Sequence, residues 1–350
     1  MPTTSSSFAH SAAGLSAGSL STFLLYPVDL VKIRLQVNES STRAAAFRGT
    51  QALAEVKTLL RAERAALKRS PPGPGRPLKL VPPFLLKYRA LYSGLTPSLA
   101  GNGLSWGGYF LVYNQAKTLL LSGKEAHSNA DYLLASALSG TCMVCLTNPI
   151  WLVKTRMQLQ VKAAAARPYR NVPDAFRTIV REEGVGALYK GVGPAMMLVS
   201  HGMVQFAIYE NLKLLFPANA RKPVFKSGPG SAPLTPWHKM KDSMGYLCMG
   251  AVSKVVASTV TYPIQVIKSR MQQRSTGWEV VKGSAATAEE GTLKEFTGRS
   301  YPTFLSAVRR VHGGEGLMGF WKGAGTNAFR VAPNAAITFL TYETVVDALS

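Results

Sequence analysis

The sequence predicts an all-α membrane protein with six transmembrane helices in three pseudo-threefold repeats, each of which also contains a short helix. One ten-residue segment occurs three times, as PVDLVKIRLQ (Pro27 to Gln36), PIWLVKTRMQ (Pro149 to Gln158) and PIQVIKSRMQ (Pro263 to Gln272). The three prolines are 122 and 114 residues apart, so each repeat takes about a third of the chain. Each repeat holds two apolar segments, which makes six spans.

The proline that opens each copy predicts a bend in a membrane helix. Proline removes a backbone donor and clashes with the preceding turn. In lipid, such a bend survives only where it is packed inside protein or lines a cavity. Each copy then carries a basic residue five positions after the proline, a second at seven and a glutamine at nine. Three bends in one frame favour helices that converge on a common axis, with the basic residues just beyond the convergence.

The spans follow the apolar runs in order. We expect helices at Phe8–Val37, Thr96–Lys117, Asp131–Lys162, Pro194–Lys213, Lys239–Gln273 and Thr326–Leu349. The repeat boundaries that fit these spans are 1–121, 122–216 and 237–350. A connector rich in Pro, Gly and Ser separates the last two repeats at 217–236.

The charge balance narrows the function classes. The chain has 40 basic and 18 acidic residues and a formal net charge of +22, which in a soluble protein would favour nucleic-acid binding. The basic residues gather at helix ends and in loops, however, and this pattern favours anionic lipid or an anionic solute as partner. No nucleophile and base pair, metal cluster or glycine-rich phosphate loop is visible, so we expect neither an enzyme nor a protein with a bound cofactor or metal.

The triplicate pattern P-x-[DE]-x-x-[KR]-x-[RK]-x-Q resembles the signature of the mitochondrial carrier family. A second family element occurs as EGVGALYKG (Glu183 to Gly191) and EGLMGFWKG (Glu315 to Gly323), whereas the first repeat has Leu86 and Lys87 before ALYSG. The resemblance implies a monomeric, multi-pass transporter of the mitochondrial inner membrane. It also implies that the short helices lie on the matrix side and that the solute passes by alternating access.

Two cations in the middle of spans are candidate solute ligands. Counting back nine residues from each signature proline gives Gly18, Gly140 and Lys254, and the last span contains Arg330. A cation within a span is costly, which makes it a candidate functional residue. Pairing with a carboxylate is the structural alternative, but the third and fifth spans offer no acid at that depth.

The family resemblance implies further contact points around a central solute site. Asn102 is equally consistent with a helix-to-helix hydrogen bond, and Trp106 would offer an aromatic surface beside the cations. The candidate solute-binding residues are Lys254, Arg330, Asn102, Gly101, Leu198, Val199 and Trp106.

The resemblance also implies two gates. On the matrix side, Asp29 would pair with Lys154. Trp151 and Gln265 replace the acids of the second and third signatures, so Lys268 would lose its partner and Lys32 would bond an amide. The family's bracing glutamines would be Gln36, Gln158 and Gln272.

The cytosolic gate would contain two ion pairs. The segments YNQAK, YENLK and YETVV follow the family motif [FY]-[DE]-x-x-[RK] in part. Lys117 would pair with Glu210, and Lys213 with Glu343.

The choice of solute depends on a few residues. Trp151 resembles the tryptophan of carriers of nucleotide-like cofactors, and the segments GLSWGGYFLVYN and TYPIQVIKSR resemble those of carriers of folate and FAD. We therefore expect FAD or folate as the transported solute. The alternatives are a carrier of NAD or pyrimidine nucleotides and a folate carrier of the chloroplast envelope.

Overall fold

A computed structural model describes residues 4–38, 52–61, 88–121, 129–160, 169–215, 236–274, 277–280, 293–296 and 301–349. Leu86, Lys87 and nearly all of the expected connector lie outside these residues. The chain divides into two compact units. Unit 1 comprises Met1–Leu25, Ser200–Tyr262 and Thr326–Ser350, and unit 2 comprises Tyr26–Val199 and Pro263–Gly325. Repeat boundaries at 1–121, 122–216 and 237–350 stay a prediction.

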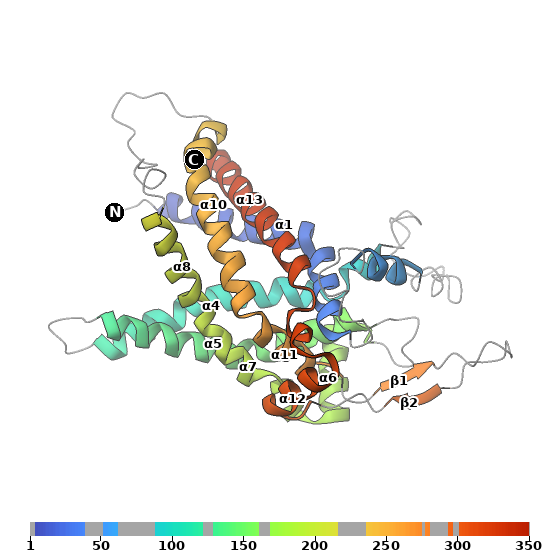
Figure 1. Ribbon diagram of the computed structural model, residues 1–350. Coiled ribbons are helices and arrows are strands. Elements are labelled where there is room, and N and C mark those ends of the chain that lie inside the picture. The colour runs from blue at the N-terminus through green and yellow to red at the C-terminus, as the bar shows by residue number, and fades with distance from the viewer. Residues whose placement is uncertain are drawn as a thin grey trace, which may run out of the picture. The chain divides into compact units, whose positions relative to one another are not determined.

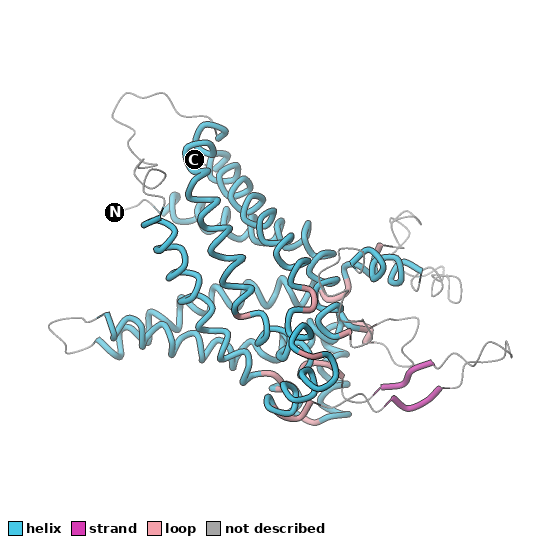
Figure 2. The backbone as a smooth tube through the Cα atoms, viewed as in Figure 1, coloured by secondary structure: helices cyan, strands magenta, loops and turns pink. Residues whose placement is uncertain are grey.

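Nearly every described segment is helical, as Figures 1 and 2 show. The elements in chain order, with η for 3-10 helices, are α1 (Thr4–Val37), η3 (Arg89–Tyr92), α4 (Leu95–Leu121), α5 (Asn129–Leu159), α6 (Val172–Glu183), η4 (Val185–Tyr189), α7 (Val192–Met197), η5 (Leu198–Ser200), α8 (His201–Leu215), α10 (Pro236–Val260), α11 (Tyr262–Met271), β1 (Gly277–Val280), β2 (Leu293–Phe296), α12 (Phe304–Glu315), η6 (Leu317–Trp321) and α13 (Ala324–Leu349). A further helix covers residues 52–61. Within the described ranges, the six expected spans correspond to α1, α4, α5, α7 with α8, α10 with α11, and α13.

A short hairpin departs from the all-α expectation. β1 and β2 pair antiparallel, with Gly277 opposite Phe296 and Val280 opposite Leu293. The two four-residue runs, GWEV and LKEF, contain aromatic and branched residues that favour strands, and they are too short to show the periodicity of an amphipathic helix. The hairpin lies between α11 and α12, outside the six expected spans, and it was not predicted from the sequence.

Two of the expected spans are interrupted. The fourth span changes to a 3-10 turn at Leu198–Ser200, between α7 and α8. The fifth is broken at Thr261, between α10 and α11. Pro263, two residues later, has no N–H to donate and crowds the preceding turn, so the break falls where proline sterics place it. Pro27 and Pro149, in contrast, lie inside continuous helices.

By length and composition, two helical stretches in the described chain are apolar enough to cross a membrane, Asp131–Leu159 and Val185–Leu215. The other long helices mix polar residues into their apolar runs, and α10 carries Lys254. Large apolar side chains nonetheless face outward along α5, where Leu133, Leu134 and Leu138 are 60%, 55% and 52% exposed. Exposed apolar surface of this kind marks an interaction surface, and a lipid-facing helix has one.

The short helices are set by caps at both ends. Asn171 accepts a hydrogen bond from the Asp174 N–H at the start of α6, and Thr303 forms a capping box with Ser306 at the start of α12. Gly184 caps the C-terminus of α6 and Gly316 caps that of α12, and both glycines have a positive φ.

Each short helix buries one face against the signature segment of its own repeat. Leu59 of the helix at 52–61 packs with Tyr26 and Leu30, Ile179 packs with Leu152 and Val153, and Val311 packs with Ile267. These three apolar clusters lie within unit 2. They hold the chain just after each signature proline, which is where the candidate gate residues lie.

Gly94 and Gly191 lie in tight contacts that require glycine. Their φ angles are +85° and +81°. A Cβ atom on Gly94 would lie 2.9 Å from the Tyr26 hydroxyl and 3.1 Å from the Lys154 carbonyl oxygen. On Gly191 it would lie 3.1 Å from Gln272 Cγ. A side chain at either position would therefore be strained by the backbone and crowded by the signature segment of the following repeat.

Candidate functional site

The three signature segments bring six side chains together in unit 2. Residues three apart lie on one face of a helix, so each segment presents two side chains to its neighbours. We refer to this set as the gate ring. It consists of Asp29 and Lys32 on α1, Trp151 and Lys154 on α5, and Gln265 and Lys268 on α11.

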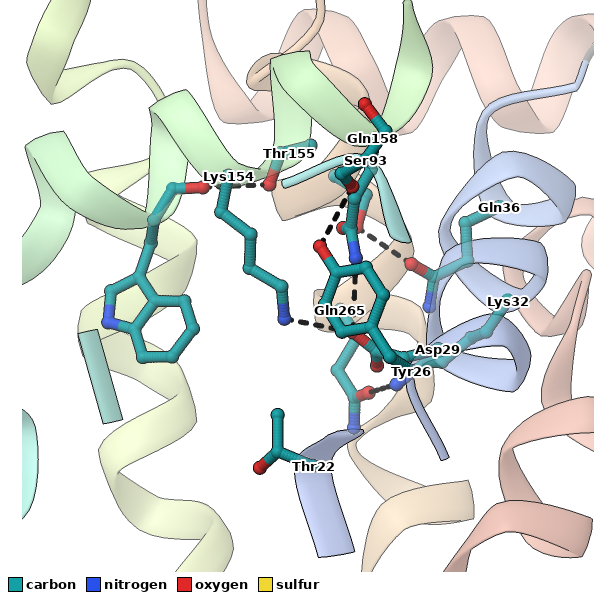
Figure 3. A network of polar contacts seen from close by, with 12 residues as sticks. Thr22, Tyr26, Asp29, Lys32, Gln36, Ser93, Lys154, Thr155, Gln158 and Gln265 are labelled. Carbon is teal, nitrogen blue, oxygen red and sulfur yellow. Dashed lines mark hydrogen bonds and ion pairs between the residues drawn. The ribbon is translucent and has the colours of Figure 1, made fainter. Parts of the chain in front are cut away.

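One ion pair joins α1 to α5. Lys154 Nζ lies 2.9 Å from Asp29 Oδ2, and both side chains are largely buried, at 14% and 15% exposure. The Gln158 amide donates to the same carboxylate oxygen at 3.2 Å. The Tyr26 hydroxyl donates at 2.9 Å to the Ser93 carbonyl oxygen beside this network. Figure 3 shows these side chains converging, with dashed lines along the contacts.

Lys154 has a second neighbour on its own helix. Its ammonium group lies 5.2 Å from the centroid of the Trp151 ring, within range of a cation–π interaction. Beside the same indole, a Cβ atom on Gly101 of α4 would lie 3.3 Å from Trp151 Cζ2. Trp151 therefore packs closely against Gly101, which was predicted as a solute contact.

The second contact of the gate ring joins α1 to α11. Lys32 Nζ donates to Gln265 Oε1 at 3.1 Å. The ammonium group is charged and the amide oxygen is neutral. The contact is therefore a charge-assisted hydrogen bond and not an ion pair.

The third position, between Trp151 and Lys268, has no such contact. Within the described ranges, Lys268 makes no side-chain hydrogen bond or ion pair. The charge acting on it is that of Lys154, which repels it. The ring thus holds three ammonium groups and one carboxylate.

The expected bracing glutamines have different partners. The Gln158 amide donates to the Asp29 carboxylate of the ion pair. Gln36 Oε1 instead accepts from the Ser269 hydroxyl at 2.7 Å, and Gln272 Oε1 accepts from the Thr155 hydroxyl at 2.9 Å. The third equivalent position is Ile33, which has no hydroxyl to donate.

Three arginines form a cycle that sequence reasoning did not identify. Arg34 Nε donates to the Gln158 carbonyl oxygen at 3.0 Å, Arg156 Nε to that of Gln272 at 3.2 Å, and Arg270 Nε to that of Gln36 at 2.9 Å. Each guanidinium thus binds a carbonyl group at the end of the next signature helix, where carbonyls lack helical partners. The signal in the sequence is the basic residue at position seven of every copy.

Two of these arginines also bind carboxylates of the second family element. Both nitrogens at the tip of Arg156 contact Glu183, at 2.6 and 2.9 Å, and Lys190 lies 2.6 Å from the same carboxylate. Arg270 contacts Glu315 in the same bidentate way, and Lys322 lies 2.6 Å from that carboxylate. The glutamate of the EG dipeptide is therefore an anchor for its own signature arginine.

A further set of contacts joins the second and third repeats outside the spans. Arg274 lies 2.6 Å from Glu182 and 5.3 Å from the centroid of the Tyr169 ring. Burial raises the pKa of the Tyr169 hydroxyl, which stays neutral at physiological pH.

The candidate solute residues lie in both units. In unit 2, Gly101, Asn102 and Trp106 are on α4, and Leu198 and Val199 are on η5. A Cβ atom on Gly140 would lie 2.9 Å from Val199 Cγ1, so Val199 covers that glycine. The side chain of Trp106 lies outside the described part of the chain.

In unit 1, Lys254 on α10 and Arg330 on α13 are close enough for the positive charge of Arg330 to act on Lys254. Within the described ranges, Lys254 makes no side-chain hydrogen bond or ion pair. Two polar pairs also lie in unit 1: Asn327 Nδ2 donates to Ser258 Oγ at 2.6 Å, and His201 Nδ1 lies 3.0 Å from Thr261 Oγ1.

The candidate cytosolic gate residues contact other partners. Lys213 lies 3.2 Å from Glu210, one turn earlier on α8. Lys117 lies 5.4 Å from the centroid of the Tyr132 ring. The side chain of Glu343 lies outside the described part of the chain. The pairs Lys117 with Glu210 and Lys213 with Glu343 therefore stay predictions.

Comparison with known proteins identifies the family. Residues 3–65, 125–220 and 239–350 match the family model described as mitochondrial carrier protein. The chain is 35% identical over 340 residues to the chloroplastic folate transporter 1 of Arabidopsis thaliana, covering 96% of this chain and 94% of that protein. It is 30% identical over 336 residues to the mitochondrial nicotinamide adenine dinucleotide transporter 2 of the same plant, covering 96% and 78%.

A third relative is a mitochondrial FAD carrier protein of Saccharomyces cerevisiae, 29% identical over 346 residues and covering 95% of this chain and 94% of that protein. The resemblance inferred from the signature segments is thus confirmed over almost the whole chain. The chain belongs to the mitochondrial carrier protein family.

Proposed function

We propose that this carrier transports an anionic, nucleotide-like cofactor, FAD or folate, through a central site by alternating access. The observation that carries the proposal is the environment of Lys254. It lies on a long helix, makes no hydrogen bond or ion pair within the described ranges, and is repelled by Arg330. An anion that enters beside Lys254 and Arg330 would stabilise both cations.

The relatives favour cofactors as solutes. Their names state transport of folate, nicotinamide adenine dinucleotide and FAD, and all three solutes combine anionic groups with planar rings. Trp106 is the aromatic residue proposed to stack on such rings, and Gly101, Asn102, Leu198 and Val199 are the other proposed contacts. NAD is the second candidate, because the plant relative of 30% identity is named as a nicotinamide adenine dinucleotide transporter.

The gate ring is proposed to close the matrix side. In the described part of the chain, the contacts between ring residues of different helices are the ion pair of Lys154 with Asp29 and the hydrogen bond of Lys32 to Gln265. A gate of modest strength suits alternating access, because closing one side must release enough free energy to open the other. Lys117, Glu210, Lys213 and Glu343 are proposed to act in the same way on the cytosolic side.

The proposed location is the mitochondrial inner membrane, where the chain would act as a monomer among anionic lipids. A chloroplast envelope location is the alternative, because the folate relative is named as chloroplastic. A fluorescent fusion of the full chain, expressed in cells of the source organism, is imaged together with markers for mitochondria and chloroplasts. Overlap with one marker or the other separates the two locations.

A competition assay tests the solute. Purified protein in liposomes loaded with unlabelled FAD is supplied with labelled FAD, and folate, NAD and UTP are added as competitors. We expect FAD and folate to inhibit uptake most strongly. Stronger inhibition by NAD would replace FAD and folate with the second candidate. No protein-dependent uptake of FAD, and none of folate, NAD or UTP when each is supplied in labelled form instead, would reject cofactor transport.

A further inference from the structure

We propose that the gate ring contains a second anion-binding site, at Lys268 and beside Lys154, that takes a phosphate or carboxylate group. This inference goes beyond the proposed function because it concerns the gate and does not depend on which solute is carried. It rests on the three-fold arrangement of the ring, in which two positions have a short polar contact and the third has none.

The two filled positions show what the third lacks. Between α1 and α5 the contact is Lys154 to Asp29 at 2.9 Å, and between α11 and α1 it is Lys32 to Gln265 at 3.1 Å. In both, an ammonium group meets a side-chain oxygen. Between α5 and α11 the residue that would supply the oxygen is Trp151, whose indole has none.

The third position therefore has a cation and no acceptor. Lys268 is only partly exposed, and within the described ranges it makes no side-chain hydrogen bond or ion pair. The charge that acts on it is positive, from Lys154. Partial burial of a cation beside another cation is unfavourable, and either a bound anion or loss of the proton relieves it.

The ring's one carboxylate, Asp29, is engaged elsewhere. Its Oδ2 atom accepts from Lys154 at 2.9 Å and from Gln158 at 3.2 Å, and within the described ranges no hydrogen bond or ion pair joins Asp29 to Lys268. An anion at Lys268 would supply the acceptor that Trp151 does not. The edge of the indole, which carries partial positive charge, is compatible with that anion.

Such a site gives the solute a role in gating. An anion that binds the closed ring stabilises the closed state by mass action, in proportion to its affinity and concentration. A phosphate or carboxylate group of the solute could therefore bind at Lys268 on its way to the matrix.

Thermal unfolding of the purified full-length protein tests the site, with inorganic phosphate as the probe. Phosphate is titrated against sodium chloride at constant ionic strength. We expect the midpoint of the parent to rise with the logarithm of phosphate concentration, by roughly 2–4 °C for each tenfold increase above the dissociation constant.

Two variants remove the site in different ways. Lys268→Gln deletes the cation at the third position, so its midpoint in chloride should exceed that of the parent and should rise less with phosphate. Trp151→Glu supplies an internal carboxylate, and it should also melt higher in chloride and show the same reduced response. If one of the two fails to fold, the other decides the result.

Two controls separate this site from other effects. Lys254→Gln removes a cation of the proposed central site, and Arg309→Gln removes an exposed charge on α12. Arg309→Gln should keep the full phosphate response, and Lys254→Gln should keep the part of the response that comes from the gate ring. The proposal is overturned if the parent shows no response, if all variants respond equally, or if Lys254→Gln abolishes the response while Lys268→Gln keeps it. Failure of FAD or folate transport leaves these outcomes unchanged, because phosphate is the probe.

Discussion

Lys154 Nζ lies 2.9 Å from the carboxylate of Asp29, across 125 residues of sequence. Breaking a fully buried ion pair costs about 3–5 kcal/mol because it leaves an unpaired charge, and partial exposure reduces that figure here. Asp29→Lys should therefore lower both the unfolding temperature and the rate of transport. The double variant with Lys154→Asp should recover part of both. If the double variant transports no faster than Asp29→Lys alone, direct pairing loses its support.

Gln265→Glu converts the amide contact of Lys32 into an ion pair with little change in shape. We expect the variant to melt at a higher temperature than the parent, because a charged acceptor strengthens the 3.1 Å contact. We also expect slower exchange, because a tighter matrix gate opens less readily. The measurement is initial uptake into liposomes together with thermal unfolding. A variant that exchanges faster at an unchanged melting temperature would contradict a closing role for this contact.

Glu183→Gln tests the anchor of Arg156. The guanidinium is 1% exposed and the carboxylate 6%, so the variant leaves two cations, Arg156 and Lys190, on a neutral amide. We expect a loss of several kcal/mol in unfolding free energy, in line with removal of one buried ionic partner. Glu182→Gln is the matched control, since Glu182 is 29% exposed and pairs at the surface with Arg274. Equal melting temperatures for the two variants would show that Glu183 is not an anchor.

Gly191→Ala should destabilise the protein by about 1–3 kcal/mol, because alanine is strained at a φ of +81° and its Cβ would lie 3.1 Å from Gln272 Cγ. Gly193→Ala, two residues along α7, is the control because a Cβ there meets nothing within 4 Å. Thermal unfolding of the two purified variants gives the comparison. Equal stabilities would mean that the contact between repeats at Gly191 can relax without cost.

The repeated signature explains why much of the gate ring could be predicted from sequence. Equivalent residues of the three copies lie at equivalent depths. The pairs Asp29 with Lys154 and Lys32 with Gln265 could therefore be predicted from their positions within the signature. The substitution of an acid by Trp151 likewise indicated that Lys268 lacks a carboxylate partner. These inferences needed only register, which the prolines supply.

Other contacts depend on side-chain choices that register does not decide. Gln36 and Gln272 accept from Ser269 and Thr155, residues that lie between the two basic positions of the signature and were not considered. From sequence, each arginine side chain could have faced solvent or bound a carboxylate. In the structure, all three donate to a backbone carbonyl group.

The departures in the fold have local causes. The strands β1 and β2 are too short to give a clear periodicity. The 3-10 turn at Leu198–Ser200 joins α7 to α8, and 3-10 turns are frequent as connectors at helix ends.

The central claim, that Lys254 and Arg330 bind the anionic part of the solute, is tested most directly by uptake into liposomes. Initial rates of FAD and folate uptake are measured for the parent, Lys254→Gln, Arg330→Gln and the control Lys57→Gln, whose side chain is exposed on the helix at 52–61. Loss of a charge-assisted contact worth about 1.5–3 kcal/mol lowers affinity roughly tenfold or more. We predict that Lys254→Gln and Arg330→Gln each lower the affinity for solute roughly tenfold or more and melt no lower than the parent. Lys57→Gln should transport normally. A folded Lys254→Gln protein whose affinity and rate match the parent for both solutes would contradict the account.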